Sequence, residues 1–174
     1  LGVEPTNIAK IAREENNIET IQEFFTEEVA KGIVATHGHA KVITATNVFA
    51  HMAPLGEVMR GLVTLIDPSD GIFILENQYL LDVLQSNQFE GIYHEHVRTY
   101  SLKALTKLMP QYGLEVFDVQ RASRYGGNIR AYVAPKGTRE ISENVPNLLK
   151  EEEEAGLFNE EVWAKWRERV HQNK

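Results

Sequence analysis

The strongest constraint on the fold is an alternation of apolar, β-branched runs with helical patterns. Residues 41–50 (KVITATNVFA) and 71–77 (GIFILEN) are rich in β-branched and large apolar residues, which is typical of buried strands. Between them a helical pattern opens at Pro54 and places apolar side chains on one face, namely Leu55, Val58, Met59, Leu62, Val63 and Ile66. A strand, a helix and a second strand in this order predict a parallel sheet covered by helices.

The same alternation of strand and helix patterns extends toward the N-terminus. Residues 1–4 (LGVE) are expected to form a short strand, and Thr6 to cap a helix whose apolar residues begin at Ile8. Residues 18–25 (IETIQEFF) are a weaker strand candidate. Thr26 is expected to cap a second helix that ends at Gly38.

The order of predicted elements changes in the second half of the chain, where one helix is followed by two strands. Ser101 is expected to cap a helix that Pro110 ends or kinks. Residues 114–120 (LEVFDVQ) and 128–135 (NIRAYVAP) favour strands, and their spacing predicts an antiparallel hairpin at the edge of the sheet. The intervening Gly126-Gly127 pair either makes the turn or lets a substrate phosphate approach the backbone.

The tail from residue 142 onward is helical in pattern and acidic. Its run at residues 150–154 (KEEEE) is predicted to be a solvated helix face. The following helix has an apolar side made of Val162, Trp163, Trp166 and Val170, which needs a partner.

Composition excludes several classes of protein. The chain carries a net charge of −7, whereas nucleic-acid-binding domains usually present a basic face, so no nucleic-acid partner is expected. The absence of Cys excludes disulfides and thiolate zinc sites and makes the cytoplasm the default location. No apolar run approaches the ~18 residues of a membrane-spanning helix. The chain starts without Met, inside a predicted strand, so we expect a fragment of a longer protein, and the sequence does not set the oligomeric state.

The most distinctive motif is Tyr93-His94-Glu95-His96, four consecutive side chains that can take part in proton transfer. One interpretation is a metal site, because His94 and His96 would share one face of a strand. The Glu that an oxygenase metal site of the cupin type would place three or four residues later is missing. A second interpretation is acid–base chemistry, and a third is an exposed polar loop.

Acid–base chemistry suits these residue types. Imidazole titrates near neutrality, with a reference pKa of ~6.5, so it can accept a proton from carbon. A nearby carboxylate can orient an imidazole, and a phenol can donate a hydrogen bond to a developing oxyanion.

Several segments together resemble a known family. They are FEGIYHEHVRTYSL (89–102), LEVFDVQ (114–120) and GGNIRAYVA (126–134), with LGVEP (1–5), TNVFAHM (46–52) and GIFILEN (71–77) upstream. In combination they resemble the S-adenosylmethionine-dependent C-methyltransferases that act on nucleotide-linked keto-deoxysugars in deoxysugar biosynthesis. The resemblance covers roughly residues 1–137.

The resemblance implies a fold, a cofactor and a substrate class. It implies an α/β fold, a Rossmann-like class I methyltransferase sheet of parallel strands with an antiparallel edge hairpin, followed by C-terminal helices. Residues 1–90 would then be a partial S-adenosyl-L-methionine-binding domain without its first strand and glycine loop. Residues 91–174 would begin the C-terminal C-methyltransferase region. The implied partner is a small-molecule nucleotide-sugar substrate, with no nucleic acid and no membrane.

The resemblance also assigns roles to single residues. Glu4, at the end of the first strand, matches the acidic residue that accepts hydrogen bonds from the cofactor ribose, as in dinucleotide folds. Asn47 is expected at the cofactor site and His51 beside the methyl-transfer centre, because both follow a strand where open α/β sheets place ligands. Glu76 and Asn77 end the next strand and are expected to bind substrate.

The remaining expectations concern the substrate and the chemistry. Arg130 is expected to pair with a substrate diphosphate. We hypothesise that His96 removes the proton next to the sugar ketone, while Tyr93, Glu95 and His51 position the sugar and stabilise the enolate oxygen.

Two other functions remain open on the sequence alone. One is a non-catalytic binding domain with a decayed cofactor site, for which the missing glycine loop would be the main sign. The other is a metal-dependent enzyme that uses the His94/His96 pair.

Overall fold

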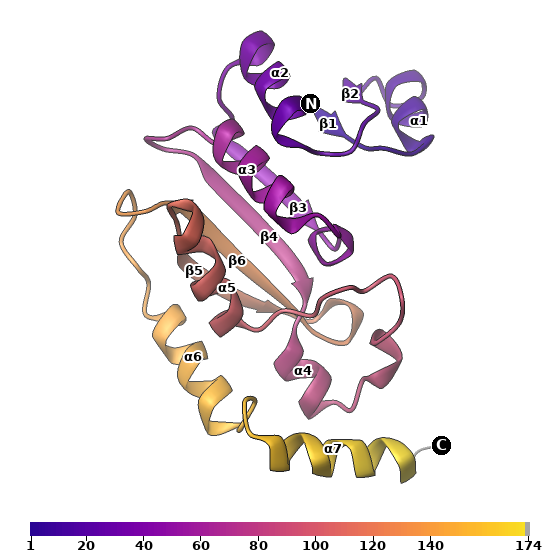
Figure 1. Ribbon diagram of the computed structural model, residues 1–174, viewed down its shortest axis with the longest axis vertical. Coiled ribbons are helices and arrows are strands. Elements are labelled where there is room, and N and C mark those ends of the chain that lie inside the picture. The colour runs from indigo at the N-terminus through magenta and orange to yellow at the C-terminus, as the bar shows by residue number, and fades with distance from the viewer. Residues whose placement is uncertain (173–174) are drawn as a thin grey trace. The chain divides into compact units, whose positions relative to one another are not determined.

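The computed structural model describes residues 1–172 and divides them into two compact units (Figure 1). The first unit comprises Leu1–Ala40 and Pro54–Asp67, and the second comprises Lys41–Ala53 and the chain from Pro68 onward. Within residues 1–172, no helix has both the length and the apolar character needed to cross a membrane.

The first unit contains a small parallel sheet and a helix pair. Strand β1 (Gly2–Val3) pairs in parallel with β2 (Thr20–Ile21), and helix α1 (Ile8–Glu14) connects them. Helix α2 (Glu27–His37) packs against α3 (Leu55–Leu65). Their close approach depends on Gly61, because a Cβ atom there would lie 2.8 Å from the carbonyl oxygen of Thr26.

The predicted boundaries of the first unit are confirmed in part. The Thr26 hydroxyl accepts a hydrogen bond from the Val29 N–H, and Gly38, with φ of +79°, ends α2 as expected. The predicted cap at Thr6 is wrong by one residue, because the N-cap position is Asn7 and the Thr6 hydroxyl accepts from the Ile8 N–H in a local turn. The candidate strand at 18–25 is reduced to the two residues of β2.

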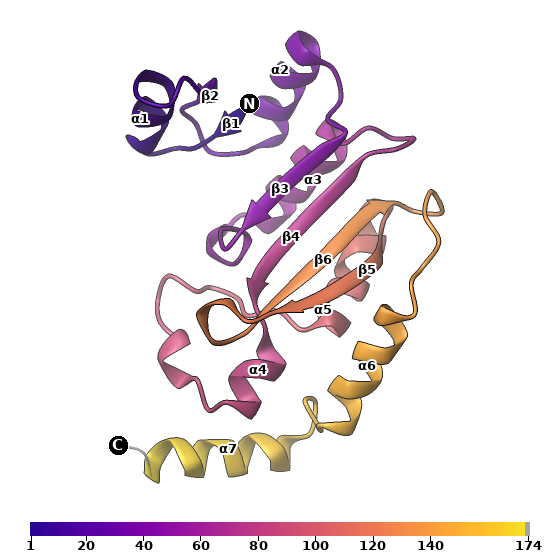
Figure 2. The ribbon, with the colours of Figure 1, turned by 180° about the vertical axis from the view of Figure 1, so that it is seen from behind.

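The second unit is built on a four-stranded sheet, seen from behind in Figure 2. Its strands are β3 (Val42–Thr46), β4 (Ile72–Gln78), β5 (Leu114–Ala122) and β6 (Asn128–Pro135), and their order is β3-β4-β6-β5. Strands β3 and β4 are parallel, whereas β6 runs antiparallel to both of its neighbours. The predicted parallel strands and antiparallel edge hairpin are therefore confirmed.

The prediction that residues 41–50 form a buried strand is wrong for burial. Positions along β3 alternate between exposed and half-buried, and Val42 is 58% exposed. The physical reason is its place in the sheet, since β3 is the outer strand and pairs with β4 alone within the described residues. By contrast, β4 and β6 lie inside the sheet and supply core residues such as Phe73, Leu75 and Ile129.

Short helices complete the second unit. They are α4 (Leu80–Gln85), α5 (Leu102–Leu108), α6 (Asn144–Glu154) and α7 (Glu160–Gln172), with single 3-10 turns η1 (Phe49–His51), η2 (Phe89–Gly91), η3 (Met109–Tyr112) and η4 (Arg124–Gly126). The Ser101 hydroxyl accepts from the Ala104 N–H, so the predicted cap of α5 is confirmed. The helix α5 ends at Leu108, just before the 3-10 turn η3 that contains Pro110, as expected.

The acidic run in α6 is not wholly solvated, which corrects the prediction for residues 150–154. Glu152 is 0% exposed. Its carboxylate accepts hydrogen bonds from the Tyr79 hydroxyl at 2.9 Å and from the backbone N–H groups of Leu102 and Lys103 at the start of α5. Burial raises the pKa of Tyr79, and the neighbouring Glu152 charge adds to the effect. This carboxylate therefore joins α6, α5 and the end of β4.

Removing this carboxylate should destabilise the fold. In the Glu152→Ala variant, two backbone N–H groups and one phenol lose their acceptor, so we expect a loss of about 3 kcal/mol in the free energy of unfolding. Urea denaturation measures this loss. Glu153→Ala on the same helix, an exposed position, is the matched control and should stay within about 0.5 kcal/mol of wild type. Equal losses in both variants would show that Glu152 has no special role.

Candidate active site

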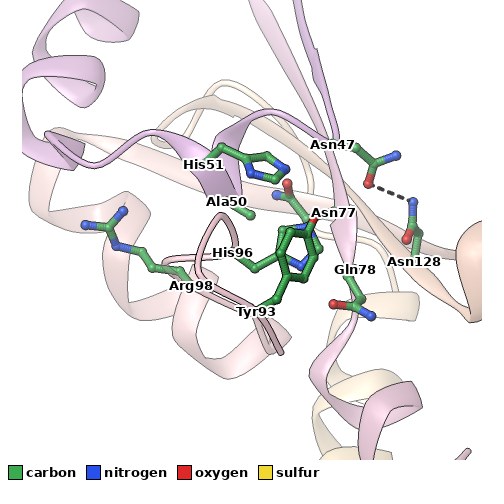
Figure 3. Close-up of a pocket in the computed structure, with 9 residues that line it drawn as sticks. All are labelled: Asn47, Ala50, His51, Asn77, Gln78, Tyr93, His96, Arg98 and Asn128. Carbon is green, nitrogen blue, oxygen red and sulfur yellow. Dashed lines mark hydrogen bonds between the residues drawn. The ribbon is translucent and has the colours of Figure 1, made fainter. Parts of the chain in front are cut away.

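A cavity of about 240 Å³ lies at the end of the second unit's sheet (Figure 3). Its lining comes from three places: the segment after β3, the end of β4 with the start of β6, and the loop that carries the Tyr-His-Glu-His motif. The lining residues are Asn47, Ala50, His51, Asn77, Gln78, Tyr93, His96, Arg98 and Asn128. Ligand sites of open α/β sheets lie at this end, beyond the carboxyl ends of the parallel strands.

At Asn47 the chain leaves β3 and turns toward the segment that lines the cavity. It adopts a left-handed conformation with φ of +53°, which Asn tolerates better than most residues, and its N–H donates to the Glu76 carbonyl at 2.7 Å. This bond ties the end of β3 to the end of β4. The chain then forms the 3-10 turn that carries His51.

His96 is held in a defined orientation by the backbone. Its Nδ1 lies 2.7 Å from the Gly91 carbonyl oxygen, so Nδ1 carries the hydrogen and the lone pair of the neutral ring is on Nε2. The Tyr93 hydroxyl lies 3.4 Å from that Nε2, and the two ring centroids are 4.4 Å apart. Because Nε2 carries the lone pair, it is the nitrogen through which the His96 ring can accept a proton, either from the Tyr93 hydroxyl or from a ligand in the cavity.

His51 is oriented by the same device. Its Nδ1 lies 2.9 Å from the carbonyl oxygen of Glu95, which again leaves Nε2 as the nitrogen with the lone pair. The His51 and His96 ring centroids are 4.7 Å apart. The expected grouping of His51, Tyr93 and His96 is therefore present around one cavity.

The side chains of the other two motif residues, His94 and Glu95, lie outside the cavity. The side chain of His94 is 89% exposed and that of Glu95 is 61% exposed, with 4.0 Å between the His94 Nε2 and the Glu95 carboxylate. Neither side chain lines the cavity, and Glu95 contributes its backbone carbonyl instead. Among residues 1–172, no three His, Cys, Asp or Glu side chains are grouped so that they could hold a metal ion.

A charged network is hydrogen-bonded to the lining residue Asn128. Glu76 is 2% exposed, and its carboxylate pairs with the Arg130 guanidinium through Nε at 2.7 Å and through the terminal nitrogen at 2.6 Å. The Asn128 Nδ2 donates both to Glu76 at 3.2 Å and to the Asn47 Oδ1 at 3.1 Å. Burial alone would raise the pKa of Glu76, but the hydrogen bonds from Arg130 and Asn128 outweigh it and hold that pKa below its ordinary value.

Of the other residues predicted to bind ligands, one lines the cavity, one forms an ion pair and one belongs to the first unit. Asn77 is 1% exposed and lines the cavity, whereas Arg130 is engaged with Glu76. Glu4 belongs to the first unit, where it follows β1. Its N–H donates to the Ile21 carbonyl at 3.0 Å, and one carboxylate oxygen accepts from the Thr6 N–H at 2.8 Å.

Four lining residues were missed by sequence reasoning: Ala50, Gln78, Arg98 and Asn128. The register of the sheet is the signal for Asn128, because the first residue of β6 faces Gln78 at the end of β4. Arg98 donates to the carbonyl oxygens of Met52 at 2.8 Å and Ala53 at 2.9 Å, and so ties the motif loop to the segment after β3.

Two family models match the chain. One, described as a methyltransferase domain, matches residues 2–119, and the other, described as a C-methyltransferase C-terminal domain, matches residues 123–174. Among curated proteins, the C-methyltransferase NovU of Streptomyces niveus is 38% identical over 159 residues, which is 90% of this chain and 37% of NovU. The chain therefore spans little more than a third of this relative.

Solved structures support the fold. A SAM-dependent methyltransferase from Anabaena variabilis superposes with a TM-score of 0.57 at 15% identity, covering 78% of this chain and 67% of that one. An O-methyltransferase family protein from Burkholderia thailandensis gives a TM-score of 0.50 at 14% identity, covering 78% and 43%. At these identities the likeness concerns the fold alone, and it confirms the Rossmann-like methyltransferase fold.

The Glu76–Arg130 pair should make stability depend on pH. Because the folded-state pKa of Glu76 is lowered, the pair's contribution is present above the unfolded-state value near 4.5 and is lost as pH falls through the folded-state value. In Arg130→Leu, burial should instead raise that pKa. We expect a loss of about 2 kcal/mol at pH 7, discounted because the Arg130 side chain is 40% exposed, and a smaller loss at pH 4.

Urea denaturation at pH 4, 5.5 and 7 measures this difference. Arg167→Leu, an exposed position on α7, is the matched control for loss of a guanidinium. A loss for Arg130→Leu that is independent of pH would contradict the assignment of its effect to Glu76.

Proposed function

Because this chain belongs to the methyltransferase domain family, we propose that it forms part of an S-adenosylmethionine-dependent C-methyltransferase. Support for a carbon acceptor comes from the match to the C-methyltransferase C-terminal domain and from the likeness to a C-methyltransferase, NovU. The proposed acceptor is a nucleotide-linked keto-sugar, which is the substrate class implied by the family resemblance that the motif Tyr93-His94-Glu95-His96 and the later strand segments carry together.

The observation that carries this proposal is the fixed orientation of His96. Methylation of a carbon requires a carbon nucleophile, and a ketone provides one when the proton on the neighbouring carbon is removed. With Nδ1 bonded to the Gly91 carbonyl at 2.7 Å, the His96 ring presents Nε2 as the base. On accepting the proton, the ring becomes an imidazolium whose Nδ1–H keeps its bond to the Gly91 oxygen.

The groups beside His96 can stabilise and position an enolate. The Tyr93 hydroxyl, 3.4 Å from the His96 Nε2, can turn to donate to a developing enolate oxygen. His51, whose Nδ1 is fixed by the Glu95 carbonyl at 2.9 Å, presents a second imidazole to the same cavity. The proposed role of Glu95 is exerted through this carbonyl, which positions His51. Glu76 and Arg130 form one ion pair, which reaches the cavity through the hydrogen bond from Asn128 to Glu76.

The two proposed cofactor ligands belong to different units, and each has its own chemistry within its unit. Glu4 is half-buried at the carboxyl end of a parallel strand and offers carboxylate oxygens as acceptors, which is the chemistry that ribose hydroxyls require. Asn47 stands at the corresponding end of β3, where its side chain is fixed by Asn128. When bound, S-adenosylmethionine supplies an electrophilic methyl group on a sulfonium centre.

Exchange of hydrogen with solvent isolates the proton-transfer step. In the full-length protein, His96→Asn should slow exchange at the carbon next to the ketone of a nucleotide-linked keto-sugar by about 10²–10⁴-fold, because the base is lost. Proton NMR in deuterated solvent measures this rate. His94→Asn, an exposed neighbour outside the cavity, should exchange at the wild-type rate. Exchange at the wild-type rate in His96→Asn would remove His96 as the base.

Calorimetry with S-adenosylhomocysteine tests the cofactor residues separately. In the full-length protein, Glu4→Gln keeps an oxygen that can accept from the Thr6 N–H but replaces the other acceptor with an amide donor. We expect the dissociation constant to rise about tenfold. Glu23→Gln, at an exposed position of the same unit, should bind as wild type does. Unchanged binding by Glu4→Gln would reject Glu4 as a cofactor ligand.

A further inference from the structure

Three amide side chains on the cavity leave polar atoms unsatisfied. Both amide atoms of Asn77, the Oδ1 of Asn128 and the Oε1 of Gln78 are buried and have no hydrogen-bond partner among residues 1–172. Asn77 is 1% exposed and Asn128 is 0% exposed, and all three residues line the same cavity. Since the large majority of buried polar atoms are hydrogen-bonded in folded proteins, four such atoms around one cavity indicate groups that receive a ligand.

The chemistry around Glu76 fixes which amide atoms of Asn128 are free. The ionised Glu76 carboxylate can only accept hydrogen bonds, so the Asn128 Nδ2 faces it at 3.2 Å. The same nitrogen donates to the Asn47 Oδ1 at 3.1 Å (Figure 3), which leaves the Asn128 Oδ1 as the free atom. The unsatisfied set therefore contains three carbonyl oxygens and one NH₂ group.

This end of the cavity is also poor in positive charge. Arg98 is the only Arg or Lys among the nine described lining residues, and its guanidinium donates to the carbonyl oxygens of Met52 and Ala53. Figure 3 draws that guanidinium directed away from the amides of Asn77 and Asn128. An anion placed against three carbonyl oxygens would meet partial negative charge, so a phosphate or carboxylate is disfavoured here.

We propose that the amides of Asn77, Gln78 and Asn128 bind the uncharged, hydroxyl-bearing carbonyl part of the methyl acceptor. The Asn77 Nδ2 donates to an oxygen acceptor on the ligand, and the three amide oxygens accept from ligand hydroxyl groups. This inference rests on the proposed function, in which the methyl acceptor carries a carbonyl group. It adds to that proposal by placing the sugar ring of the acceptor beside Asn77, Gln78 and Asn128, and any diphosphate in another part of the site. Asn77 is the central residue, since both of its amide atoms are unpartnered.

Side-chain amide NMR tests the inference without turnover. Full-length protein labelled with ¹⁵N-asparagine is titrated with hydroxyacetone, with acetone, which lacks the hydroxyl, and with inorganic phosphate. We expect the Asn77 side-chain resonance to shift with hydroxyacetone, and to shift less at equal concentrations of acetone or phosphate. A larger shift with phosphate, or no shift with hydroxyacetone, would overturn the inference.

Two variants distinguish ligand binding from a structural role. Asn77→Leu removes two unpartnered buried polar atoms, so its melting temperature should equal or exceed that of wild type. The same variant should lose the response to hydroxyacetone at the remaining cavity resonances. Asn87→Gly removes another amide whose Oδ1 is buried and unpartnered but lies outside the cavity, at φ of +54°, and should leave that response intact. A fall in melting temperature for Asn77→Leu with binding retained would contradict the inference.

A turnover experiment separates this inference from the proposed function. Wild type should favour a nucleotide-linked keto-sugar with a hydroxyl beside the ketone over its deoxy analogue by about tenfold or more in kcat/KM, and Asn77→Leu should lose this preference. If wild type methylates neither compound but the Asn77 resonance responds to hydroxyacetone, the proposed function fails and the ligand class stands. Methylation of both compounds without preference would reject the ligand class alone.

Discussion

One buried side-chain amide holds the functional end of the sheet together. The Nδ2 of Asn128, at the first residue of β6, donates to the Asn47 Oδ1 after β3 and to Glu76 near the end of β4. Asn128 is 0% exposed, so its NH₂ group has no contact with water. Without these two hydrogen bonds the buried NH₂ group would be unpaired, at a cost of about 1–3 kcal/mol. Three strands from distant parts of the chain thus end at fixed positions, and the cavity is built on those ends.

The two imidazoles depend on the backbone in the same way. His51 and His96 each place Nδ1 against a carbonyl oxygen, those of Glu95 and Gly91, at 2.9 and 2.7 Å. A carbonyl oxygen accepts and never donates, so each bond selects one tautomer and leaves Nε2 as the basic nitrogen. The motif loop is itself anchored by Arg98 to the segment after β3. The orientation of the two imidazoles is therefore set by backbone carbonyl groups and not by neighbouring carboxylates.

The sequence predicted those features that depend on local pattern. The caps at Thr26 and Ser101 and the strands around Glu76 follow from side chains close in sequence, and the structure confirms them. The turn accounts for the glycine pair, since Gly127 has φ of +132° and a Cβ atom there would overlap the Asp82 carboxylate. The motif placed Tyr93, Glu95 and His96 together with His51, and Tyr93 and His96 line the cavity with it, whereas the Glu95 side chain is exposed and only its backbone carbonyl contacts His51.

Other features depend on contacts between segments far apart in the chain. The exposure of β3 follows from its outer place in the sheet, and composition alone does not reveal strand order. Burial of Glu152 requires the start of α5 and Tyr79 to lie beside one turn of α6, although the four neighbouring charged residues suggested a solvated face. The role of Asn128 requires the register between β4 and β6, in which it stands opposite Gln78.

The ion pair of Glu76 and Arg130 also bears on the chemistry proposed for the cavity. An enolate is an anion, and at an effective dielectric constant of ~20 any unpaired negative charge within roughly 6 Å of an anion would oppose its formation by about 3 kcal/mol or more. That amount corresponds to roughly a hundredfold in rate. Arg130 neutralises Glu76 while leaving it an acceptor for Asn128, so the network can fix the strand ends without adding net charge. A Gln at position 76 would also be uncharged, but its amide could not pair with the Arg130 guanidinium as a charge. The same pair thus fixes the strand ends and leaves no unpaired negative charge on the Glu76 carboxylate beside Asn128.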